Sequence, residues 1–375
     1  MLRVPFAFHQ MSRSFSSSAI ANSIRAKVML YSQYGQPDQV LRCVSHELPS
    51  SPKGKEVLLQ TIACPINPSD INQIQGVYPS RPELKVQYGQ SEPVAVGGNE
   101  GLFKVLAVGD QVSGLKEGDW VIPSNVNFGT WRSHVLSEES ALMKMEKTIS
   151  ANQAATIAVN PSSAYQMLTL FEELKPGDWF IQNGGNSQVG RSAIQIGKKL
   201  GLNSISIVRN RDNLKELVDE LTGLGATKVI TEEENASKEF GKTIAEWTNG
   251  KPIKLALNCV GGDNCTNMVR KLGQDGTLVT YGGMSMKPVT IPTTMFIFKN
   301  ITAKGFWVSA NIKRIPGSRE NTIKAVQKMM EDGDLVDVKM YENPVSADAS
   351  EDQVYQAFQK ALANSNKGKQ LVVFS

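Results

Sequence analysis

The chain has 375 residues, of which 41% are hydrophobic and 20% charged, and its net charge is +4 from 40 basic and 36 acidic side chains. This composition indicates a globular protein of about two domains. No basic run is interleaved with aromatic residues, so nucleic acid is not the expected partner. No segment approaches the roughly 18 uninterrupted apolar residues of a membrane-spanning helix.

The first 22 residues are the expected mitochondrial transit peptide. No acidic residue occurs before position 38, whereas residues 1–27 contain Arg3, Arg13, Arg25, Lys27 and many serines. An Arg-rich, Ser-rich and acid-free segment is typical of such a peptide, and a secretory signal would need a clean apolar stretch. A disordered tail without a targeting role is the alternative.

The cysteines predict neither disulfides nor a zinc site. Cys43, Cys64, Cys259 and Cys265 form no C-x-x-C pair, and the three histidines are scattered. Buried free thiols in a reducing compartment are the expected state. So few scattered ligands do not suggest a tetrahedral metal site.

In chain order, residues 27–150 read as β-rich. The runs "VMLYSQYG", "EVLLQTIACPI", "GLFKVLAVG" and "DWVIPS" are short, rich in β-branched residues and broken by Gly, Pro and Asp. Such runs predict antiparallel strands joined by irregular loops.

The pattern changes near residue 150. An Ala-rich stretch over 150–171 has helical spacing, and strands then alternate with helices, from "DWFIQ" and "SISIVR" through "KVI" and "IKLALNCVG" to "TLVTYGG". We expect one of these helices at "NMVRKLGQDG", 267–276. Apolar strands between amphipathic helices predict a parallel, doubly wound sheet. The tail reads as two helices and a last strand, which we expect to rejoin the first domain.

The stretch "NGGNSQVG", residues 183–190, lies between a predicted strand and a predicted helix. Gly185 and Gly190 occupy the first and third positions of a dinucleotide fingerprint, and Ser187 replaces the middle glycine. We expect Gly185 to make the tight turn and Gly190 to let the helix pack closely. The helix is expected to begin near Val189 and to direct its free N–H groups at phosphates.

The next strand ends in "VRNRD". An NAD site usually has an acidic residue there for the ribose 2′-hydroxyl. Here the position is taken by Arg209, Asn210 and Arg211, and arginine can bind a 2′-phosphate through paired N–H groups. The sequence therefore predicts NADPH; two solvated arginines at a strand end are the alternative.

Residues 66–82, "INPSDINQIQGVYPSRP", contain a candidate acid. Pro79 favours an extended Tyr78, and together with Gly76 it turns the chain so that the tyrosine could project into a cleft. A neutral phenol can donate a hydrogen bond to an oxyanion or a proton to a carbanion. A packed loop aromatic is the alternative reading of Tyr78.

The two-part organisation resembles the medium-chain dehydrogenase/reductase superfamily from about residue 27 to the end. Zinc members carry a cysteine after the first strands and a "GHE" motif, where this chain has "PINPSDIN" and "GGNEG". Asn99 thus stands where the histidine ligand would be, so no catalytic zinc is expected. The resemblance implies an α/β fold: a β-rich GroES-like catalytic domain, 23–160 and 318–375, and a Rossmann NADPH-binding domain, 161–317.

Four motifs, "NPSD…QGVYP", "GNEG", "TYGGMS" and "KGFWV", narrow the resemblance to the mitochondrial trans-2-enoyl-thioester reductases. In that family the motif tyrosine is the proton donor, which corresponds to Tyr78. The resemblance also implies the cofactor-binding residues, which are Asn160, Ser187, Gln188, Val189, Gly190, Arg209, Asn210, Arg211, Tyr281, Gly282, Gly283, Met284, Phe306, Trp307, Val308 and Lys369. For Lys369 the alternative is one more solvated lysine.

This resemblance implies NADPH-dependent reduction of enoyl thioesters, carried by acyl carrier protein or CoA, in fatty-acid synthesis of the mitochondrial matrix. It also implies a homodimer through the Rossmann domain, with "NITAKGFWVS" as the edge of the sheet. An NADPH:quinone reductase is one alternative. A nucleotide-sensing binding protein without turnover is the other, because a fold does not fix a function.

Overall fold

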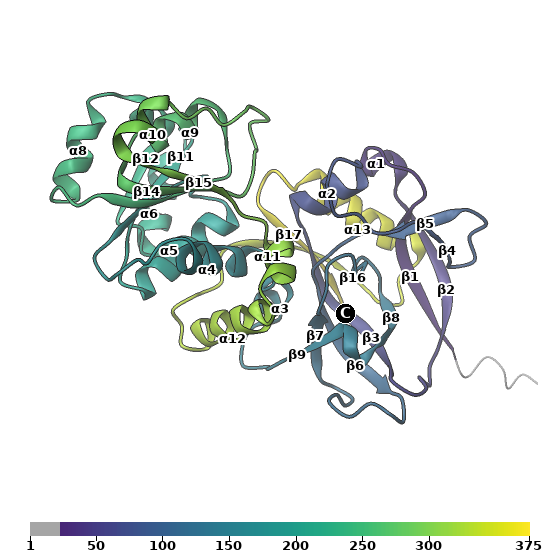
Figure 1. Ribbon diagram of the computed structural model, residues 1–375. Helices are drawn as coiled ribbons and strands as arrows, with labels where there is room; N and C mark the ends of the chain where they lie inside the picture. Colours follow the sequence, from purple (N-terminus) through teal and green to yellow (C-terminus); the bar gives the residue numbers. More distant parts are fainter. Residues whose placement is uncertain (1–22) are drawn as a thin grey trace, which may run out of the picture.

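The computed structural model describes residues 23–375 and consists of two domains side by side (Figure 1). The expected transit peptide lies outside the described residues. The purple and blue first domain contains the antiparallel strands, and the green second domain contains the parallel sheet (Figure 1).

The first domain is built on two sheets. The four-stranded sheet has the order β2-β1-β5-β4 and is antiparallel. Its strands are β1 (Ser23–Tyr31), β2 (Arg42–Pro49), β4 (Lys85–Val86) and β5 (Pro93–Val96). The seven-stranded sheet has the order β16-β17-β3-β6-β7-β9, and β8 also pairs with β3. Its strands are β3 (Glu56–Ile66), β6 (Leu102–Val108), β7 (Trp120–Pro123), β8 (His134–Glu138), β9 (Leu142–Met145), β16 (Met340–Val345) and β17 (Lys369–Phe374).

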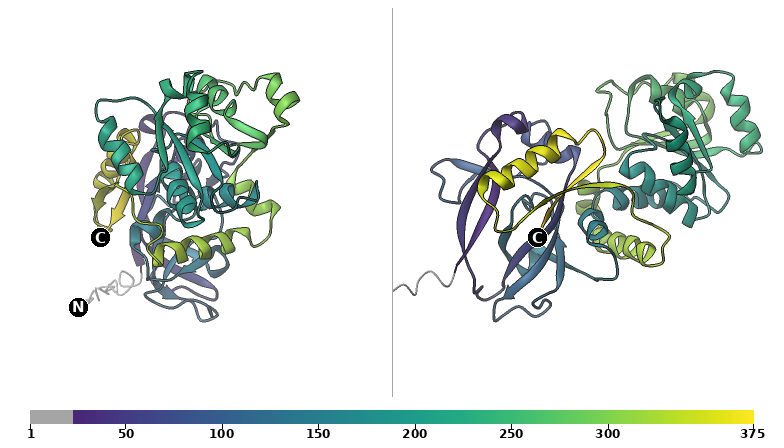
Figure 2. Two further views of the ribbon diagram at one scale, coloured as in Figure 1. Left: turned by 90° about the vertical axis from the view of Figure 1, so that its left-hand side faces the viewer. Right: turned by 180° about the vertical axis from the view of Figure 1, so that it is seen from behind.

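The end of the chain returns to the first domain. Strand β17 pairs antiparallel with β3, and it pairs in parallel with β16. Helix α13 (Glu351–Ala363) packs on the same domain, where Phe358 lies 5.3 Å from Trp131 and 6.5 Å from Phe374 between ring centroids. Figure 2 shows this yellow segment against the purple strands. The last strand therefore rejoins the first domain, as the sequence predicted.

The second domain contains a six-stranded parallel sheet in the order β12-β11-β10-β13-β14-β15. Its strands are β10 (Trp179–Asn183), β11 (Asn203–Val208), β12 (Lys228–Thr231), β13 (Ile253–Asn258), β14 (Leu272–Thr280) and β15 (Thr302–Gly305). This is the Rossmann order 3-2-1-4-5-6, whose ligand crevice lies beyond the carboxyl ends of the two central strands. Strands β10 and β13 are therefore the ones that should position a nucleotide.

Helices cover the parallel sheet and fill the junction between the domains. Helix α5 packs on β11, α9 packs on β10, and α4 joins α5 to α12. The helices are α1 (Pro37–Val40), α2 (Pro68–Ile74), α3 (Ala151–Thr156), α4 (Asn160–Leu170), α5 (Gln188–Lys199), α6 (Leu214–Gly223), α7 (Glu232–Ala236), α8 (Phe240–Trp247), α9 (Gly262–Val269), α10 (Thr293–Lys299), α11 (Val308–Arg314) and α12 (Ser318–Glu331), with a short 3₁₀ turn at Glu139–Ala141. No helix within residues 23–375 is long and apolar enough to cross a membrane.

The structure differs from the predicted helices at two places. The helix expected at 267–276 is wrong: α9 ends at Val269, and β14 already begins at Leu272, which pairs with Ile253. Pairing with the buried neighbouring strand overrides the local helical pattern there. The stretch over 150–171 is helical as predicted, but it contains two helices, α3 and α4, because a new helix starts at Asn160 with Pro161 in its first turn.

Candidate active site

The predicted phosphate loop, residues 183–190, connects β10 to α5 at the carboxyl end of the sheet. The turn is made by Gly184, which has a φ of +62°, and the Ser187 N–H donates to its carbonyl at 2.8 Å. Gly185 was expected to make this turn; instead it lies against β11, where an added Cβ would come within 2.8 Å of the Ser206 Cβ. Both glycines are therefore needed, for different reasons.

Gly190 and Ser187 shape the start of α5. A Cβ at Gly190 would lie 2.6 Å from the carbonyl oxygens of both Gly184 and Gly185, so only glycine fits here. Ser187 is the N-cap, and its hydroxyl accepts the Gly190 N–H at 3.0 Å. The other first-turn N–H groups, such as those of Gln188 and Val189, have no carbonyl partner within the helix and are available to an anion.

The arginine pair follows the strand next to this loop. The Gly185 N–H donates to the Ile207 carbonyl of β11 at 3.0 Å. This hydrogen bond joins the loop to β11 at a point two residues before Arg209. Arg209 and Asn210 are exposed, Arg211 is half-buried, and neither arginine pairs with a carboxylate within residues 23–375. Two unpaired cations beside a helix N-terminus fit a phosphate group.

A second loop runs beside the phosphate loop at the ends of β13 and β14. The Tyr281 N–H donates to Asn258 and the Met284 N–H to Cys259, both at 2.9 Å. An added Cβ at Gly282 would lie 3.2 Å from Cys259, so the two segments are in close contact. The predicted residues 281–284, Gly283 among them, therefore border the same crevice as residues 187–190.

The next three predicted residues differ in where their side chains lie. Phe306 is buried in the core and packs on Phe171 at 6.0 Å, so only its backbone is available to a cofactor. Trp307 is 36% exposed, and its ring is perpendicular to that of Tyr78 with centroids 5.8 Å apart. Val308 begins α11 and lines the cleft that contains Tyr78.

Tyr78 lies on the loop that follows α2. Gly76 turns the chain with a φ of +78°, and the Tyr78 N–H donates to Asn72 at 3.2 Å. The tyrosine lines a cleft of about 500 Å³ between the domains, whose other lining residues are Ser69, Gln73, Ser80, Asn99, Val126, Ala158, Val159, Val308, Ser309, Ile312 and Arg319. Burial raises the pKa of Tyr78 above its ordinary value of 10.0, so its hydroxyl carries a proton at physiological pH.

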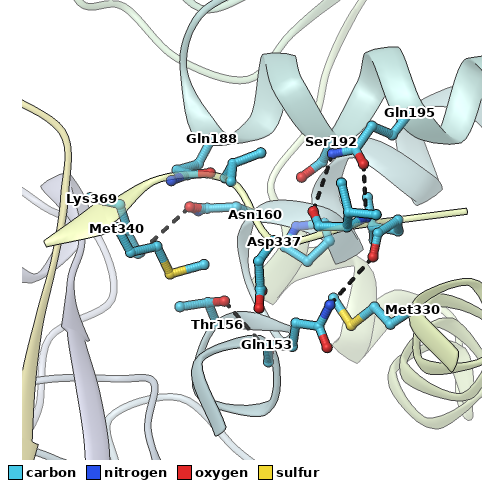
Figure 3. Close-up of a pocket in the computed structure, with 14 residues that line it drawn as sticks. Gln153, Thr156, Asn160, Gln188, Ser192, Gln195, Met330, Asp337, Met340 and Lys369 are labelled. Atoms are coloured by element: carbon cyan, nitrogen blue, oxygen red, sulfur yellow. Dashed lines mark hydrogen bonds between the residues drawn. The ribbon is translucent and has the colours of Figure 1, made fainter. Parts of the chain in front are cut away.

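A second cavity, of about 380 Å³, is lined in part by Asn160, whose neighbour Val159 lines the Tyr78 cleft (Figure 3). It brings together three predicted cofactor residues, Asn160 at the start of α4, Gln188 at the start of α5 and Lys369 at the start of β17. The Lys369 ammonium lies 3.5 Å from the Asn160 side-chain oxygen, as the dashed line in Figure 3 marks. Lys369 is only 8% exposed, so it is not a solvated tail lysine.

Behind this cavity lies a buried polar cluster that sequence reasoning missed. Lys369 donates to the Asn67 side-chain oxygen at 2.5 Å, and Asn67 donates to Glu100 at 3.0 Å. The Asn67 backbone N–H donates to Asp70 at 2.8 Å, which caps α2. Burial raises the pKa of Asp70 to about 6 and also raises that of Glu100, whereas it lowers that of Lys369. The sequence signal that could have located this cluster is the presence of polar residues directly after the strand residues "CPI" and within "GNEG".

The same cluster reaches the Tyr78 loop. Asn99 donates to both Asp70, at 2.7 Å, and Gln73, at 2.6 Å. Gln73 in turn donates to the Ser80 carbonyl at 2.6 Å and to the Asn127 side chain at 2.9 Å. The loop two residues beyond Tyr78 is thereby tied to the cluster that contains Lys369.

The zinc position of the superfamily is occupied by this amide network. Asn99, which stands at the expected histidine position, is committed to Asp70 and Gln73. Within residues 23–375 no group of three or more His, Cys, Asp or Glu side chains is placed to hold a metal ion. The four cysteines are free thiols, of which three are buried and Cys43 is half-buried.

The fold and site define a member of the medium-chain dehydrogenase/reductase superfamily without zinc ligands at the superfamily's catalytic position. The first half matches the family model described as alcohol dehydrogenase GroES-like domain over residues 53–148. The second half matches the model described as zinc-binding dehydrogenase over residues 189–331. Both halves of the superfamily architecture are therefore present.

Similar proteins narrow this class. Mitochondrial enoyl-[acyl-carrier-protein] reductase 2 of Candida tropicalis is 49% identical over 366 residues, covering 94% of each chain. A Kluyveromyces marxianus protein named NADPH quinone oxidoreductase is 44% identical over 332 residues, covering 87% of each. The solved complex of Etr1p with NADP and crotonyl-CoA has a TM-score of 0.90 at 48% identity, and the match covers 93% of this chain and all of that one. The Etr1p/Etr2p heterodimer of C. tropicalis has a TM-score of 0.90 at 49% identity with the same coverage. The chain belongs to the mitochondrial enoyl-[acyl-carrier-protein] reductase family.

Proposed function

We propose that this protein uses NADPH to reduce the C2–C3 double bond of trans-2-enoyl thioesters. The observation that carries this function is the contact of Tyr78, from the first domain, with Trp307, from the second, where Tyr78 and the neighbouring Val308 line one cleft. Family membership supports the same reaction, since the relatives include a complex that contains both NADP and an enoyl thioester.

The residues fit NADPH in two respects. Gly190 leaves the space over the loop carbonyls that a side chain would fill. Arg209 and Arg211, at the end of β11, pair with no carboxylate among residues 23–375. In this proposal residues 187–190 hold the pyrophosphate and residues 209–211 hold the 2′-phosphate. The nicotinamide end is bordered by residues 281–284 and 306–308, by Asn160 and by Lys369.

Bound NADPH supplies the hydride that adds to C3 of the enoyl thioester. The thioester carbonyl then takes the charge as an enolate, and hydrogen-bond donors in the cleft stabilise it. Tyr78 protonates C2, directly or through water, which completes the saturated acyl thioester. Because the pKa of Tyr78 is raised, the phenol remains a proton donor throughout the physiological pH range.

We place this enzyme in fatty-acid synthesis of the mitochondrial matrix, with acyl carrier protein or CoA as the thioester carrier. The mitochondrial names of the relatives and the basic, acid-free start of the chain support this location. The catalytic domain would comprise residues 23–160 and 318–375, and the NADPH-binding domain residues 161–317. The pairing of β17 with β3 supports this division.

We propose a homodimer formed through the second domain. Strand β15 is the exposed edge of the parallel sheet, and Ile297 and Phe298 of the preceding α10 are 66% and 72% exposed. Two β15 edges paired about a two-fold axis would satisfy their open backbone groups and cover these side chains. The heterodimeric assembly of the Etr1p and Etr2p relatives supports a two-chain particle.

Quinone reduction is the second candidate, because one relative at 44% identity carries that name. The experiment that separates the two is NADPH oxidation followed by absorbance with a short trans-2-enoyl-CoA or with a quinone. We expect fast oxidation with the thioester, slow oxidation with the quinone and slower oxidation still when NADH replaces NADPH. Fast oxidation with the quinone alone would overturn the proposed reaction. Tight NADPH binding without turnover of either acceptor would instead indicate a nucleotide-sensing protein.

A further inference from the structure

Glu100 is a buried carboxylate that the reaction above does not use. It lies between β5 and β6 in the first domain, is 2% exposed and lines neither cavity. A carboxylate at this depth is costly unless each of its oxygens has partners. The partners of Glu100 are therefore informative about why it is there.

Its two oxygens join segments that are far apart in the sequence. One accepts the Val159 N–H at 2.9 Å, and Val159 immediately precedes Asn160 at the junction of the domains. The other accepts from the Asn67 side chain at 3.0 Å and lies 3.9 Å from the Lys369 ammonium. Glu100 thus contacts the residue before Asn160 and also neutralises Lys369.

Lys369 needs this counter-charge because it is buried. Its ammonium donates to Asn67 at 2.5 Å and lies 3.5 Å from the Asn160 oxygen at the wall of the cavity in Figure 3. Those two neighbours are neutral amides, so the negative charge must come from Glu100, with Asp70 as the next carboxylate. A buried ion pair is a weak source of stability, so stability alone does not account for this arrangement.

We propose that Glu100 is a positioning residue for the nucleotide, holding the protonated Lys369 and the start of α4 at the wall of the cofactor cavity. The proposal rests on the proposed role of Lys369 in cofactor binding. It predicts that Glu100 acts on NADPH affinity through Lys369 and not through the fold as a whole.

The test is NADPH affinity, measured by fluorescence titration without any acceptor, so that its result is independent of which substrate is reduced. We expect Glu100→Gln to weaken NADPH binding about tenfold and Lys369→Met to weaken it at least as much. The double variant should bind within twofold of Lys369→Met alone, because glutamine at position 100 still accepts the Val159 N–H and the lost negative charge no longer has an ammonium to hold. Asp119→Asn, which removes a carboxylate paired with Lys144 at 2.8 Å away from the cavity, is the matched control and should keep wild-type affinity.

The pH dependence of NADPH affinity is a second readout, and it would not change if Glu100 had a merely structural role. The charged groups around this site are Glu100 before β6, Asp70 in α2, Lys369 in β17 and Arg319 in α12. Glu100 favours the charged form of Lys369, so without it the ammonium loses its proton at a lower pH. The affinity of Glu100→Gln should therefore fall further as pH rises from 6 to 9, whereas that of the wild type should change less.

The conservative variant Glu100→Asp keeps the charge, and we expect it to restore most of the affinity and the shallow pH profile. It also keeps the test decisive if Glu100→Gln does not fold. The proposal would be overturned by wild-type NADPH affinity in Glu100→Gln, by additive losses of affinity in the double variant, or by equal losses of affinity in the Asp and Gln variants. Wild-type affinity in Lys369→Met would overturn it together with the role of Lys369, while leaving the proposed reaction untouched.

Discussion

At the scale of single residues, the chemistry depends on side chains whose surroundings set their protonation. Tyr78 is half-buried, meets Trp307 edge to face and keeps its proton because burial opposes the phenolate. Arg209 and Arg211, in contrast, are left without carboxylate partners in the part of the chain that the structure describes. In the proposed function Tyr78 gives a proton, and the two arginines bind an anion.

The arginine pair makes a testable prediction about the choice of nucleotide. In a variant with both Arg209→Ser and Arg211→Ser, kcat/KM for NADPH should fall about tenfold or more, because two charge-assisted contacts to the 2′-phosphate are lost. The value for NADH should stay within about twofold. Steady-state kinetics with both nucleotides gives the answer, with Arg270→Ser, an exposed arginine of the same domain, as control. Equal losses with NADPH and NADH would contradict the assignment.

At the scale of elements, α2 connects the buried cluster to the Tyr78 loop. Asp70 caps the helix through the Asn67 N–H and accepts from Asn99, which links it to Gln73 and the Ser80 carbonyl. Burial raises the pKa of Asp70 from 3.8 to about 6, so ionisation of this carboxyl lowers the free energy of unfolding.

The raised pKa fixes the sign of a pH effect on stability. The folded protein binds the Asp70 proton more tightly than the unfolded chain, so this contribution is complete below pH 3.8 and is lost as pH rises through about 6. Relative to Asp70→Asn, the wild type should lose about 2–3 kcal/mol of unfolding free energy between pH 3.5 and 7. Urea unfolding at a series of pH values measures it, with the exposed Glu117→Gln as control. A constant difference between wild type and Asp70→Asn would contradict the shifted pKa.

The sequence predicted the elements with strong local patterns. The alternation of apolar strands and amphipathic helices is sufficient to predict the parallel sheet, and the spacing of Ser187 and Gly190 is sufficient to predict a tight strand-to-helix connection at the start of α5. The helix expected at 267–276 failed because pairing of Leu272 with Ile253, a non-local contact, decides the structure there. The role of Gly184 was missed because a fingerprint gives spacing but no backbone angles.

The buried cluster could not be predicted from the sequence. Asn67 and Lys369 are separated by 302 positions, and the fold alone brings them together when β17 returns to pair with β3. Each of these residues is an ordinary polar residue in its own segment. Only their shared burial marks them as a site, and burial of this kind depends on the assembled domain.

At the scale of the whole molecule, the open edge of the parallel sheet predicts the oligomeric state. Phe298→Asp places a charge on the exposed face of α10, next to β15, and should shift the protein from dimer to monomer. Sedimentation velocity measures the change, and Val86→Asp, at a similarly exposed apolar position in the first domain, should leave the dimer intact. A wild-type protein that sediments as a monomer would contradict the proposed interface.

The most direct test of the central claim separates the proposed role of Tyr78, in the first domain, from NADPH binding, which is proposed for the second domain. In single-turnover oxidation of NADPH by a trans-2-enoyl-CoA, Tyr78→Phe should be slower than the wild type by about 10²–10⁴-fold, because the phenyl ring keeps the packing against Trp307 and loses only the proton donor. NADPH affinity, measured on the same samples, should be unchanged. A Tyr78→Phe variant that reduces the thioester at the wild-type rate would contradict the account of this site as an enoyl-thioester reductase with Tyr78 as its acid.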